Sequence, residues 1–402
     1  MKIAFFVNHF IHHQELLSLE LYRLTDGNFY YVAYQPLPEE RLKLGYEDMN
    51  KKYDFIIRPY ESEEQKKLAE KIAVECDIMV AGGATYYSDL RRKTGNDKII
   101  IQYSERFFKK GRYRILFHKL LKKDKEWFNL SKNRLSENEN TYVLCASAYT
   151  AYDLQPFNFE VGKCFKWGYF TEFKEYDIDM LIKSKDTNTI NILWCARFIG
   201  LKHPEKAIFV TKKLKEKKIN FKLTMIGNGK QIEKIKKLIK INNLENEVEL
   251  TGSVPASKVR EYMEKSNIFL FTSDFNEGWG AVLNESMNSG CAIVASHAIG
   301  SVPYLIKDGE NGFIYKNNNK NDLFNKVYRL CIDKELREKV GKNAYHTMKN
   351  LWNPEVAAKR LYNTAKNLVN NKEIDFYNEG PWSKAEIIKN NWYKEIIKNE
   401  VS

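Results

Sequence analysis

The chain has 402 residues, 43% of them hydrophobic and 29% charged, with a formal net charge of +13 at pH 7. This length exceeds one ordinary hydrophobic core and predicts two domains, and the apolar content argues against a disordered chain. The six cysteines form no CxxC pair, and no histidine stands at metal-ligand spacing from them. This pattern favours reduced thiols in the cytosol over a disulfide framework or a zinc site. No apolar run approaches the ~18 residues that a membrane-spanning helix needs, and the run near the first residue is too short for a signal peptide.

The first half of the chain alternates short apolar runs with amphipathic segments. The segment at 61–75 has the spacing of an amphipathic helix, and the runs around it are rich in β-branched and aromatic residues. The expected strands are 2–7, 29–34, 54–58, 77–81, 98–103 and 141–147. Short strands that alternate with helices indicate an α/β domain with a mostly parallel sheet.

The most basic stretch of the chain is 106–134, where eleven Lys or Arg residues face only two acids, Asp124 and Glu126. Aromatic and aliphatic residues interleave with the cations. A surface helix with solvated basic side chains explains this pattern. Attachment to an anionic membrane explains it too, because apolar insertion and attraction to acidic lipids add together. Nucleic acid is the least favoured partner, because lysines are spread along the whole chain.

After a polar, strand-poor passage, the second half shows the same alternation of short apolar runs and amphipathic segments as the first. The expected strands are 190–196, 221–227, 247–252, 267–273, 292–296 and 312–315, with helices at 204–218 and 255–266 among others. We therefore predict an α/β chain of two Rossmann-like, doubly wound domains that face a central cleft. The predicted parts are a first domain at 1–170, a linker at 171–189, a second domain at 190–369 and a helical tail at 370–402 that packs on the first domain. Ligands bind beyond the carboxyl ends of strands in such sheets, so two facing edges can hold two substrates.

The stretch NEGWGAVLNES at 276–286 places Glu277 before a glycine-flanked turn and Glu285 beyond it. Gly278 and Gly280 let the backbone approach a ligand closely, and the N-terminal end of the helix that follows attracts phosphate. Glu285 can reach ribose hydroxyls and Glu277 the hydroxyls of a sugar, so the stretch fits a nucleoside diphosphate that carries a sugar. The simpler alternative is a helix after a glycine turn, with Glu277 favouring the helix dipole and Glu285 solvated. The residues expected to line the phosphates are Gly278, Trp279, Gly280, Ala281 and Val282.

Three further strand ends carry residues suited to the same ligand. Arg197 and Lys202 follow the strand at 190–196, and two cations at a sheet edge suit a pyrophosphate whose negative charge grows as it departs. Glycine-bearing turns at 226–230 and 251–255 suit close backbone contact with a nucleoside. Each feature alone also fits an ordinary surface loop, whereas four in order point to one site. The turn residues expected to contact the donor are Gly227, Asn228, Gly229, Ser253 and Val254.

Together these motifs resemble the nucleotide-binding domain of glycosyltransferase family 4 (group 1) enzymes, which have the GT-B fold, in a bacterial subgroup. The family's E-x7-E signature corresponds to Glu277 and Glu285, and its pyrophosphate-binding Arg/Lys pair corresponds to Arg197 and Lys202. The similarity spans about residues 190–365. The resemblance implies a retaining transferase that uses a sugar-nucleotide donor and no catalytic metal or other cofactor, and it assigns Glu277, Arg197 and Lys202 the catalytic roles.

The first half resembles the family less closely, because the loop at 7–17 lacks the glycine pair that relatives often have there. His9, His12 and His13 in this loop are candidates for contact with acceptor hydroxyls, although three partly exposed loop histidines also explain them. Glu105 and Arg106 stand where many relatives carry a histidine, and they are further acceptor-side candidates. No catalytic base is assigned.

The resemblance implies a retaining hexosyltransferase that moves a sugar from a nucleoside-diphosphate sugar to a saccharide or lipid-linked saccharide. Its setting would be the synthesis of bacterial surface polysaccharide or glycoconjugate. We expect it in the cytoplasm or peripherally bound at the inner face of the membrane, held there by residues 106–134. The alternatives are a sugar-nucleotide 2-epimerase of the same architecture and a non-enzymatic basic binder of membrane or nucleic acid.

Overall fold

The computed structural model describes residues 1–39, 42, 47–95, 98–109, 122–136, 139–374 and 376–394. The chain forms two compact units. The first consists of Met1–Glu172 and Asn353–Lys389, and the second of Phe173–Trp352 and Asn390–Ser402. Among the described residues, no helix combines the length and the apolar character that a membrane crossing requires.

The first unit is built on a parallel sheet with the strand order β3-β2-β1-β4-β5-β6-β7. The strands are β1 (Ile3–Val7), β2 (Phe29–Ala33), β3 (Ile56–Ile57), β4 (Ile78–Gly82), β5 (Ile99–Ser104), β6 (Thr141–Cys145) and β7 (Cys164–Lys166). The helices are α1 (His12–Leu24), α3 (Glu63–Glu75), α4 (Thr85–Arg92), α6 (Lys122–Ser136), α7 (Thr150–Leu154) and α16 (Pro354–Val369). The central strands are continuous buried apolar runs, as expected when helices cover both faces of a parallel sheet.

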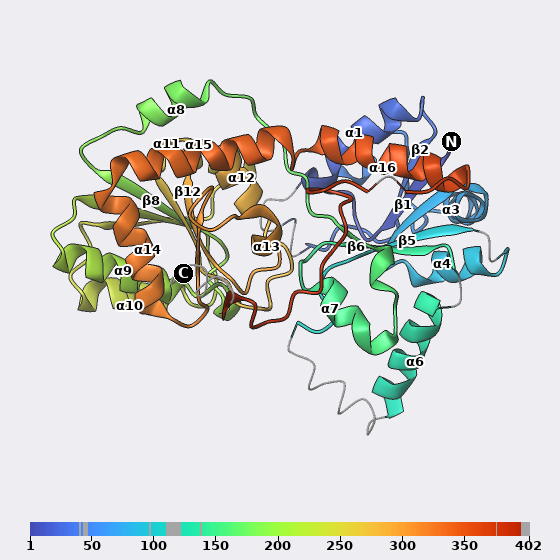
Figure 1. The fold of residues 1–402 in the computed structure, drawn as a ribbon, viewed down its shortest axis with the longest axis horizontal. Helices are drawn as coiled ribbons and strands as arrows, with labels where there is room; N and C mark the ends of the chain where they lie inside the picture. The colour runs from blue at the N-terminus through green and yellow to red at the C-terminus, as the bar shows by residue number, and fades with distance from the viewer. Residues whose placement is uncertain are drawn as a thin grey trace. The chain divides into compact units, whose positions relative to one another are not determined.

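The chain returns to the first unit at its C-terminal end. Helix α16 packs against α1, and Figure 1 shows it in orange-red running beside the blue N-terminal helix. Asn353 caps α16 by accepting a hydrogen bond from the backbone N–H of Val356, and Pro354 occupies the first turn, where no N–H is needed. The segment 376–386 then adds to this unit, since Lys384 forms an isolated bridge with Phe165 of β7.

The second unit has a parallel sheet with the strand order β10-β9-β8-β11-β12-β13. The strands are β8 (Ile190–Cys195), β9 (Phe221–Ile226), β10 (Val248–Gly252), β11 (Ile268–Phe271), β12 (Ala292–Ser296) and β13 (Phe313–Tyr315). The helices are α8 (Ile178–Ser184), α9 (Pro204–Glu216), α10 (Ile232–Ile241), α11 (Ala256–Lys265), α12 (Val282–Asn288), α13 (Val302–Leu305), α14 (Lys320–Ile332) and α15 (Lys334–Asn350). Helices α9, α10 and α14 share one core cluster with the strands.

The segment at 173–189 contains helix α8 and packs on the second unit. Ile178 and Ile182 of α8 form an apolar cluster with Tyr345 of α15. The backbone N–H of Tyr176 donates to the Tyr345 hydroxyl, which in turn donates to the carbonyl of Tyr176, 3.1 Å in each case. Much of the stretch whose composition suggests a linker is therefore held by regular packing.

The order of the strands decides where a ligand can bind in the second unit. Strand β8 lies between β9 and β11, so the chain progresses outward from β8 in two opposite directions. At such a switch point the loops after the two central strands diverge and leave room at the carboxyl edge of the sheet. The loops that follow β8 and β11 are the ones that carry Arg197, Lys202 and Glu277.

Candidate functional site

The structure brings Lys202 and Glu277 into direct contact at this edge. The ammonium of Lys202 donates to Oε2 of Glu277, and the hydroxyl of Ser273 donates to the same oxygen at 2.8 Å. The two charged side chains are only 13% and 12% exposed. A pair so shielded from water has a stronger mutual attraction than a surface salt bridge, because less solvent screens it. The sheet topology therefore joins two residues that stand 75 positions apart in sequence.

The backbone fixes the two loops to each other around this ion pair. The hydroxyl of Thr272, just after β11, donates to the carbonyl of Lys202 at 2.6 Å and accepts from the indole N–H of Trp194 in β8 at 2.8 Å. The backbone N–H of Asp274 donates to the carbonyl of Leu201 at 3.0 Å. Lys202 is thus held by its main chain as well as by its side chain.

His203 adds a second charged contact between the loops. One ring nitrogen lies 3.0 Å from Oε1 of Glu205 at the start of α9, and the other lies 3.1 Å from Oδ2 of Asp274. The hydrogen bonds to Asp274 and then to Glu205 raise the pKa of His203 above its ordinary value, against the opposing effects of burial and of the nearby Lys206 cation. No sequence pattern singled out His203, Asp274 or Ser273, although His203 directly follows Lys202 and the other two stand three and four residues before Glu277.

The glycines of the turn after β9 make room for the loop after β8. A Cβ on Gly227 would lie 2.1 Å from the carbonyl oxygen of Ala196, and one on Gly229 would lie 2.6 Å from that of Phe198. Both glycines have positive φ, +127° and +152°. The backbone N–H of Phe198 donates to the carbonyl of Asn228 at 2.8 Å. This turn therefore holds the backbone on both sides of Arg197, which explains its glycines without a ligand.

The turn after β10 is different, because its glycine meets no neighbour. Gly252 has a φ of +71°, yet a Cβ there would have nothing within 4 Å among the described residues. Its carbonyl accepts from the N–H of Gly227 at 2.8 Å. Ser253 is exposed and Val254 half-buried. The open side of this turn leaves space for a ligand to approach the backbone.

The loop between Glu277 and α12 is shaped by tight packing. A Cβ on Gly280 would lie 2.3 Å from the ring of Phe271, and φ there is +84°. The side chain of Trp279 is fully buried, and its indole N–H donates to Asn284 at 2.9 Å. Trp279 was predicted to line the phosphates, but the buried indole leaves only its backbone for such contact. Gly278 is buried, whereas Ala281 and Val282 are half-buried where α12 begins.

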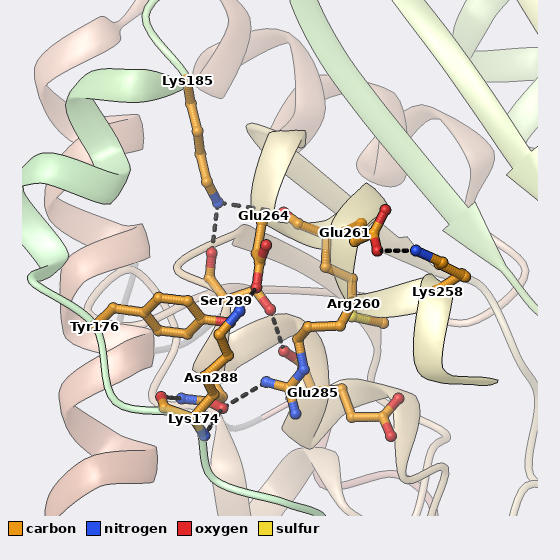
Figure 2. A network of polar contacts seen from close by, with 11 residues as sticks. Lys174, Tyr176, Lys185, Lys258, Arg260, Glu261, Glu264, Glu285, Asn288 and Ser289 are labelled. Carbon is orange, nitrogen blue, oxygen red and sulfur yellow. Dashed lines mark hydrogen bonds and ion pairs between the residues drawn. The ribbon is translucent and has the colours of Figure 1, made fainter.

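Glu285 lies on α12 close to the end of β8. Burial raises the pKa of the Cys195 thiol to about 12, and the nearby Glu285 carboxylate adds to the rise while Lys202 opposes it. The charged groups of Glu285 and Lys202, both predicted to bind the donor, are therefore near Cys195. Figure 2 shows the Glu285 carboxylate pointing away from the polar network at the other end of α12, where Arg260 donates to Asn288. Arg197, at the same edge of the sheet, is exposed.

In the first unit, two of the acceptor candidates line a cavity. It has a volume of about 180 Å³ and lies where β1 and β5 end. The lining residues are Val7, Asn8, His9, Ile11, His13, Gln14, Tyr103 and Tyr169. His9 donates from Nδ1 to the carbonyl of Gln35 at 3.3 Å, and the rings of His12 and His13 lie 3.8 Å apart at the start of α1. Apolar rings next to amide and imidazole groups form a surface suited to a sugar.

Glu105 adjoins this cavity, whereas Arg106 does not point toward it. The hydroxyl of Tyr169 donates to one carboxylate oxygen of Glu105 and Lys109 donates to the other, both at 2.6 Å. The Arg106 guanidinium is buried in an ion pair with Asp153 at 3.2 Å, with side-chain exposures of 1% and 0%. Arg106 thus stabilises the fold, and the prediction that it contacts an acceptor does not fit its position. Of the basic stretch, residues 110–121 lie outside the described part of the chain.

Comparison with known proteins finds a family match within the second unit. Residues 177–347 match the family model described as Glycosyl transferases group 1. The match contains Arg197, Lys202, Glu277 and Glu285, and it agrees with the group 1 resemblance seen in the sequence.

Individual relatives align over part of their lengths. The chain is 34% identical over 147 residues to an uncharacterized glycosyltransferase of Methanocaldococcus jannaschii, a region that covers 36% of this chain and 40% of that protein. It is 33% identical over 121 residues to an N-acetylgalactosamine-N,N'-diacetylbacillosaminyl-diphospho-undecaprenol 4-alpha-N-acetylgalactosaminyltransferase of Campylobacter jejuni, a region that covers 30% of this chain and 32% of that protein. The chain thus spans less than half the length of these curated relatives.

Solved structures resemble both units. HepE of Anabaena, solved in complex with UDP, superposes with a TM-score of 0.67 at 14% identity and covers 91% of this chain and 100% of that one. A glycosyltransferase from Rickettsia africae superposes with a TM-score of 0.65 at 17% identity and covers 92% and 99%. The prediction of two Rossmann-like α/β domains of the GT-B type is confirmed.

Proposed function

We propose that this protein is a retaining hexosyltransferase that moves a sugar from a nucleoside-diphosphate sugar to a saccharide or lipid-linked saccharide. The observation that carries the proposal is the pairing of Lys202 with Glu277 at the switch point of the unit that matches group 1 glycosyltransferases. Surface polysaccharide or glycoconjugate synthesis is the setting we propose. The name of the Campylobacter jejuni relative gives that enzyme a diphospho-undecaprenol-linked substrate, which supports a lipid-linked acceptor here.

In the proposed donor complex, Arg197 and Lys202 stabilise the pyrophosphate as it departs. Their positive charge is worth most in a site that excludes water, where solvent does not screen it. Glu285 accepts hydrogen bonds from the ribose, and Glu277 positions the transferred sugar. The nucleoside and phosphates contact the backbone at 227–229, 253–254 and 278–282. Because Glu277 and Lys202 already form an ion pair, the arriving pyrophosphate competes with a carboxylate for the lysine.

Retention follows when the acceptor attacks from the face that the leaving group vacates, and a phosphate oxygen then takes the acceptor proton. This route needs no protein base, which suits a site whose carboxylates Glu277 and Asp274 are each already paired with a cationic side chain, Lys202 and His203 respectively. It also needs no resident metal or other cofactor, since two protein cations supply the charge. The protein contributes position and electrostatics.

We propose that the acceptor sugar binds the cavity lined by His9 and His13 in the first unit. Its volume of about 180 Å³ is of the order of one sugar ring. Tyr103 and Tyr169 offer aromatic faces, and Glu105 is placed to accept hydroxyl hydrogen bonds beside them. His12, at the start of the same helix as His13, is a further candidate for acceptor contact.

We propose that the basic stretch at 106–134 binds the protein reversibly to anionic membranes, where a lipid-linked acceptor would lie. Each Lys or Arg near such a surface contributes about 1 kcal/mol, and the attraction falls off within a Debye length. The test is pelleting with acidic or neutral liposomes at low and high salt, with Lys109, Lys110, Lys122 and Lys123 changed to Glu. A matched control reverses the exposed lysines of α10, which are Lys234, Lys236, Lys237 and Lys240. Equal pelleting of the two charge-reversed proteins would contradict the membrane proposal and leave the transferase proposal intact.

Incubation with a panel of sugar nucleotides tests the transferase proposal. Phosphorus NMR follows the release of the nucleoside diphosphate as the bond between the sugar and the phosphate breaks, and proton NMR follows the configuration of the anomeric centre. A transferase slowly releases a nucleoside diphosphate and a sugar with retained configuration when water replaces the acceptor. A 2-epimerase would give an isomerised sugar nucleotide, and a non-enzymatic binder would leave the whole panel unchanged; either result would refute the proposal.

A further inference from the structure

His203 occupies the junction between the two loops that carry Lys202 and Glu277. It follows Lys202 directly, and its ring reaches Asp274, three residues before Glu277 in the other loop. The backbone N–H of Glu277 donates to the carbonyl of Asp274 at 3.0 Å, so a shift of Asp274 moves Glu277 with it. The His203 ring therefore connects the loop that carries Lys202 to the loop that carries Glu277.

The contacts of the ring require it to carry two protons. Each nitrogen lies within hydrogen-bond distance of a carboxylate, Glu205 on one side and Asp274 on the other. A carboxylate only accepts, so both nitrogens must donate, and only the imidazolium form has two N–H groups. Such charge-assisted hydrogen bonds are stronger than neutral ones.

The backbone at His203 is also unusual. Its φ and ψ of 49° and 54° lie in the left-handed region, which a residue with a Cβ seldom adopts. Pro204 begins α9 immediately afterwards, so this one residue turns the chain from the Lys202 loop into the helix. A glycine would make the same turn with less strain. The ring contacts give a physical reason for a histidine in this position.

We propose that His203, in its protonated form, is a positioning residue that clamps the Lys202 loop to the Glu277 loop and so presents both charges to the donor. The expected effect of His203 on turnover rests on the proposed function. The contact between the two loops does not, because it is present in the second unit without a ligand.

The clamp has a defined dependence on pH. Because its pKa in the folded protein is raised, the imidazolium is fully present below the ordinary histidine pKa of about 6.5 and is lost as pH rises through the folded pKa. The charged groups that face it are Asp274 from the β11 loop and Glu205 and Lys206 from α9. Turnover should therefore fall on the alkaline side.

The titration of Lys206 must be distinguished from that of His203 in the pH dependence of turnover. Burial lowers the pKa of Lys206 to about 8, so it titrates in the same alkaline range, and Lys320 of α14 adds a like charge near it. Lys206→Met keeps a long apolar stem in that buried position and removes the charge. The alkaline fall should persist in Lys206→Met and disappear in His203→Gly.

Two substitutions and one control test the clamp. His203→Gly retains the left-handed turn and removes the ring, and His203→Asn tolerates the same backbone while restoring one donor. His346→Ala removes an exposed histidine on α15 and serves as the matched control. We expect His203→Gly to lower kcat about tenfold or more with little change in donor KM, and His203→Asn to recover part of the loss.

Hydrogen exchange tests, without any substrate, whether His203 holds the two loops together. The N–H of Asp274, which donates to the carbonyl of Leu201, reports the contact between the loops. We expect its exchange to be at least about tenfold faster in His203→Gly and unchanged in His346→Ala, because a lost contact lets the loops open locally. In an NMR titration of the wild type, the His203 ring should titrate above about 6.5.

Unchanged exchange of the Asp274 amide, or a His203 ring that titrates at or below about 6.5, would overturn the clamp. Wild-type kcat with an unaltered alkaline fall in His203→Gly would overturn its role in turnover. If no sugar nucleotide is turned over by the wild type while the amide exchange still rises in His203→Gly, the proposed function fails and the clamp stands.

Discussion

Substitution of Gly227 by alanine tests how the turn after β9 supports the site. The added Cβ would lie 2.1 Å from the carbonyl oxygen of Ala196, whereas even close C–H···O contacts are roughly 3.3–3.6 Å long. The neighbouring backbone would therefore have to move by more than about 1 Å. Overpacking of this kind costs about 1–3 kcal/mol. The φ of +127° costs an alanine about 1–3 kcal/mol more.

The matched control is Gly252→Ala, which has the strain without the clash. Its φ is +71°, but a Cβ there meets nothing within 4 Å among the described residues. We expect Gly227→Ala to destabilise β8 and β9 by about 3–5 kcal/mol and Gly252→Ala by about 1–2 kcal/mol. Hydrogen exchange of peptides from β8 and β9, read by mass spectrometry, gives the opening free energy of the second unit by itself. Equal losses in the two variants would refute the packing explanation of Gly227.

Four further substitutions test the roles of charged side chains. Glu285→Ala should weaken binding of the cognate nucleoside diphosphate by about 1.5–3 kcal/mol in calorimetric titration, because a charged acceptor for ribose hydroxyls is lost; unchanged affinity would make Glu285 a bystander. Lys202→Ala and Arg197→Ala should each lower kcat more than they raise donor KM, because the cations act on charge that develops in the transition state; an effect on KM alone would confine them to ground-state binding. Asp153→Asn should destabilise the first unit by about 3–5 kcal/mol in hydrogen exchange, because it leaves the buried Arg106 cation unpaired; a loss below about 1 kcal/mol, as for a surface pair, would contradict that burial.

The fold was predictable because its signals are local. Strands such as β1 and β12 are short buried apolar runs, and the helices between them have amphipathic spacing. Glu277 and Lys202 were predicted as site residues because each follows a strand, where parallel sheets bind ligands.

The sequence could not supply the pairings that only the folded chain makes. Nothing local indicates that Lys202 meets Glu277 75 residues away, or that Arg106 is buried against Asp153 47 residues away. An arginine after a strand looks the same whether it faces a ligand or the core. His203 carries no motif, and its role depends on a turn and on two carboxylates from different elements.

Helix α16 is a further case in which the sequence predicts an element but not its packing partner. The amphipathic pattern of α16 is clear, but amphipathic spacing says only that one face is buried, not which partner buries it. The structure assigns that partner as α1 of the first unit.

Hydrogen exchange with and without a sugar nucleotide most directly tests whether the donor binds where we propose. Peptides that cover 196–203, 226–230, 252–255 and 276–286 should be protected by the donor that is turned over, since these segments line the edge of one sheet. The same peptides in Glu285→Ala should lose most of that protection. Protection confined to the first unit, or none at these segments with a donor that is demonstrably cleaved, would contradict a donor site between β8 and β11.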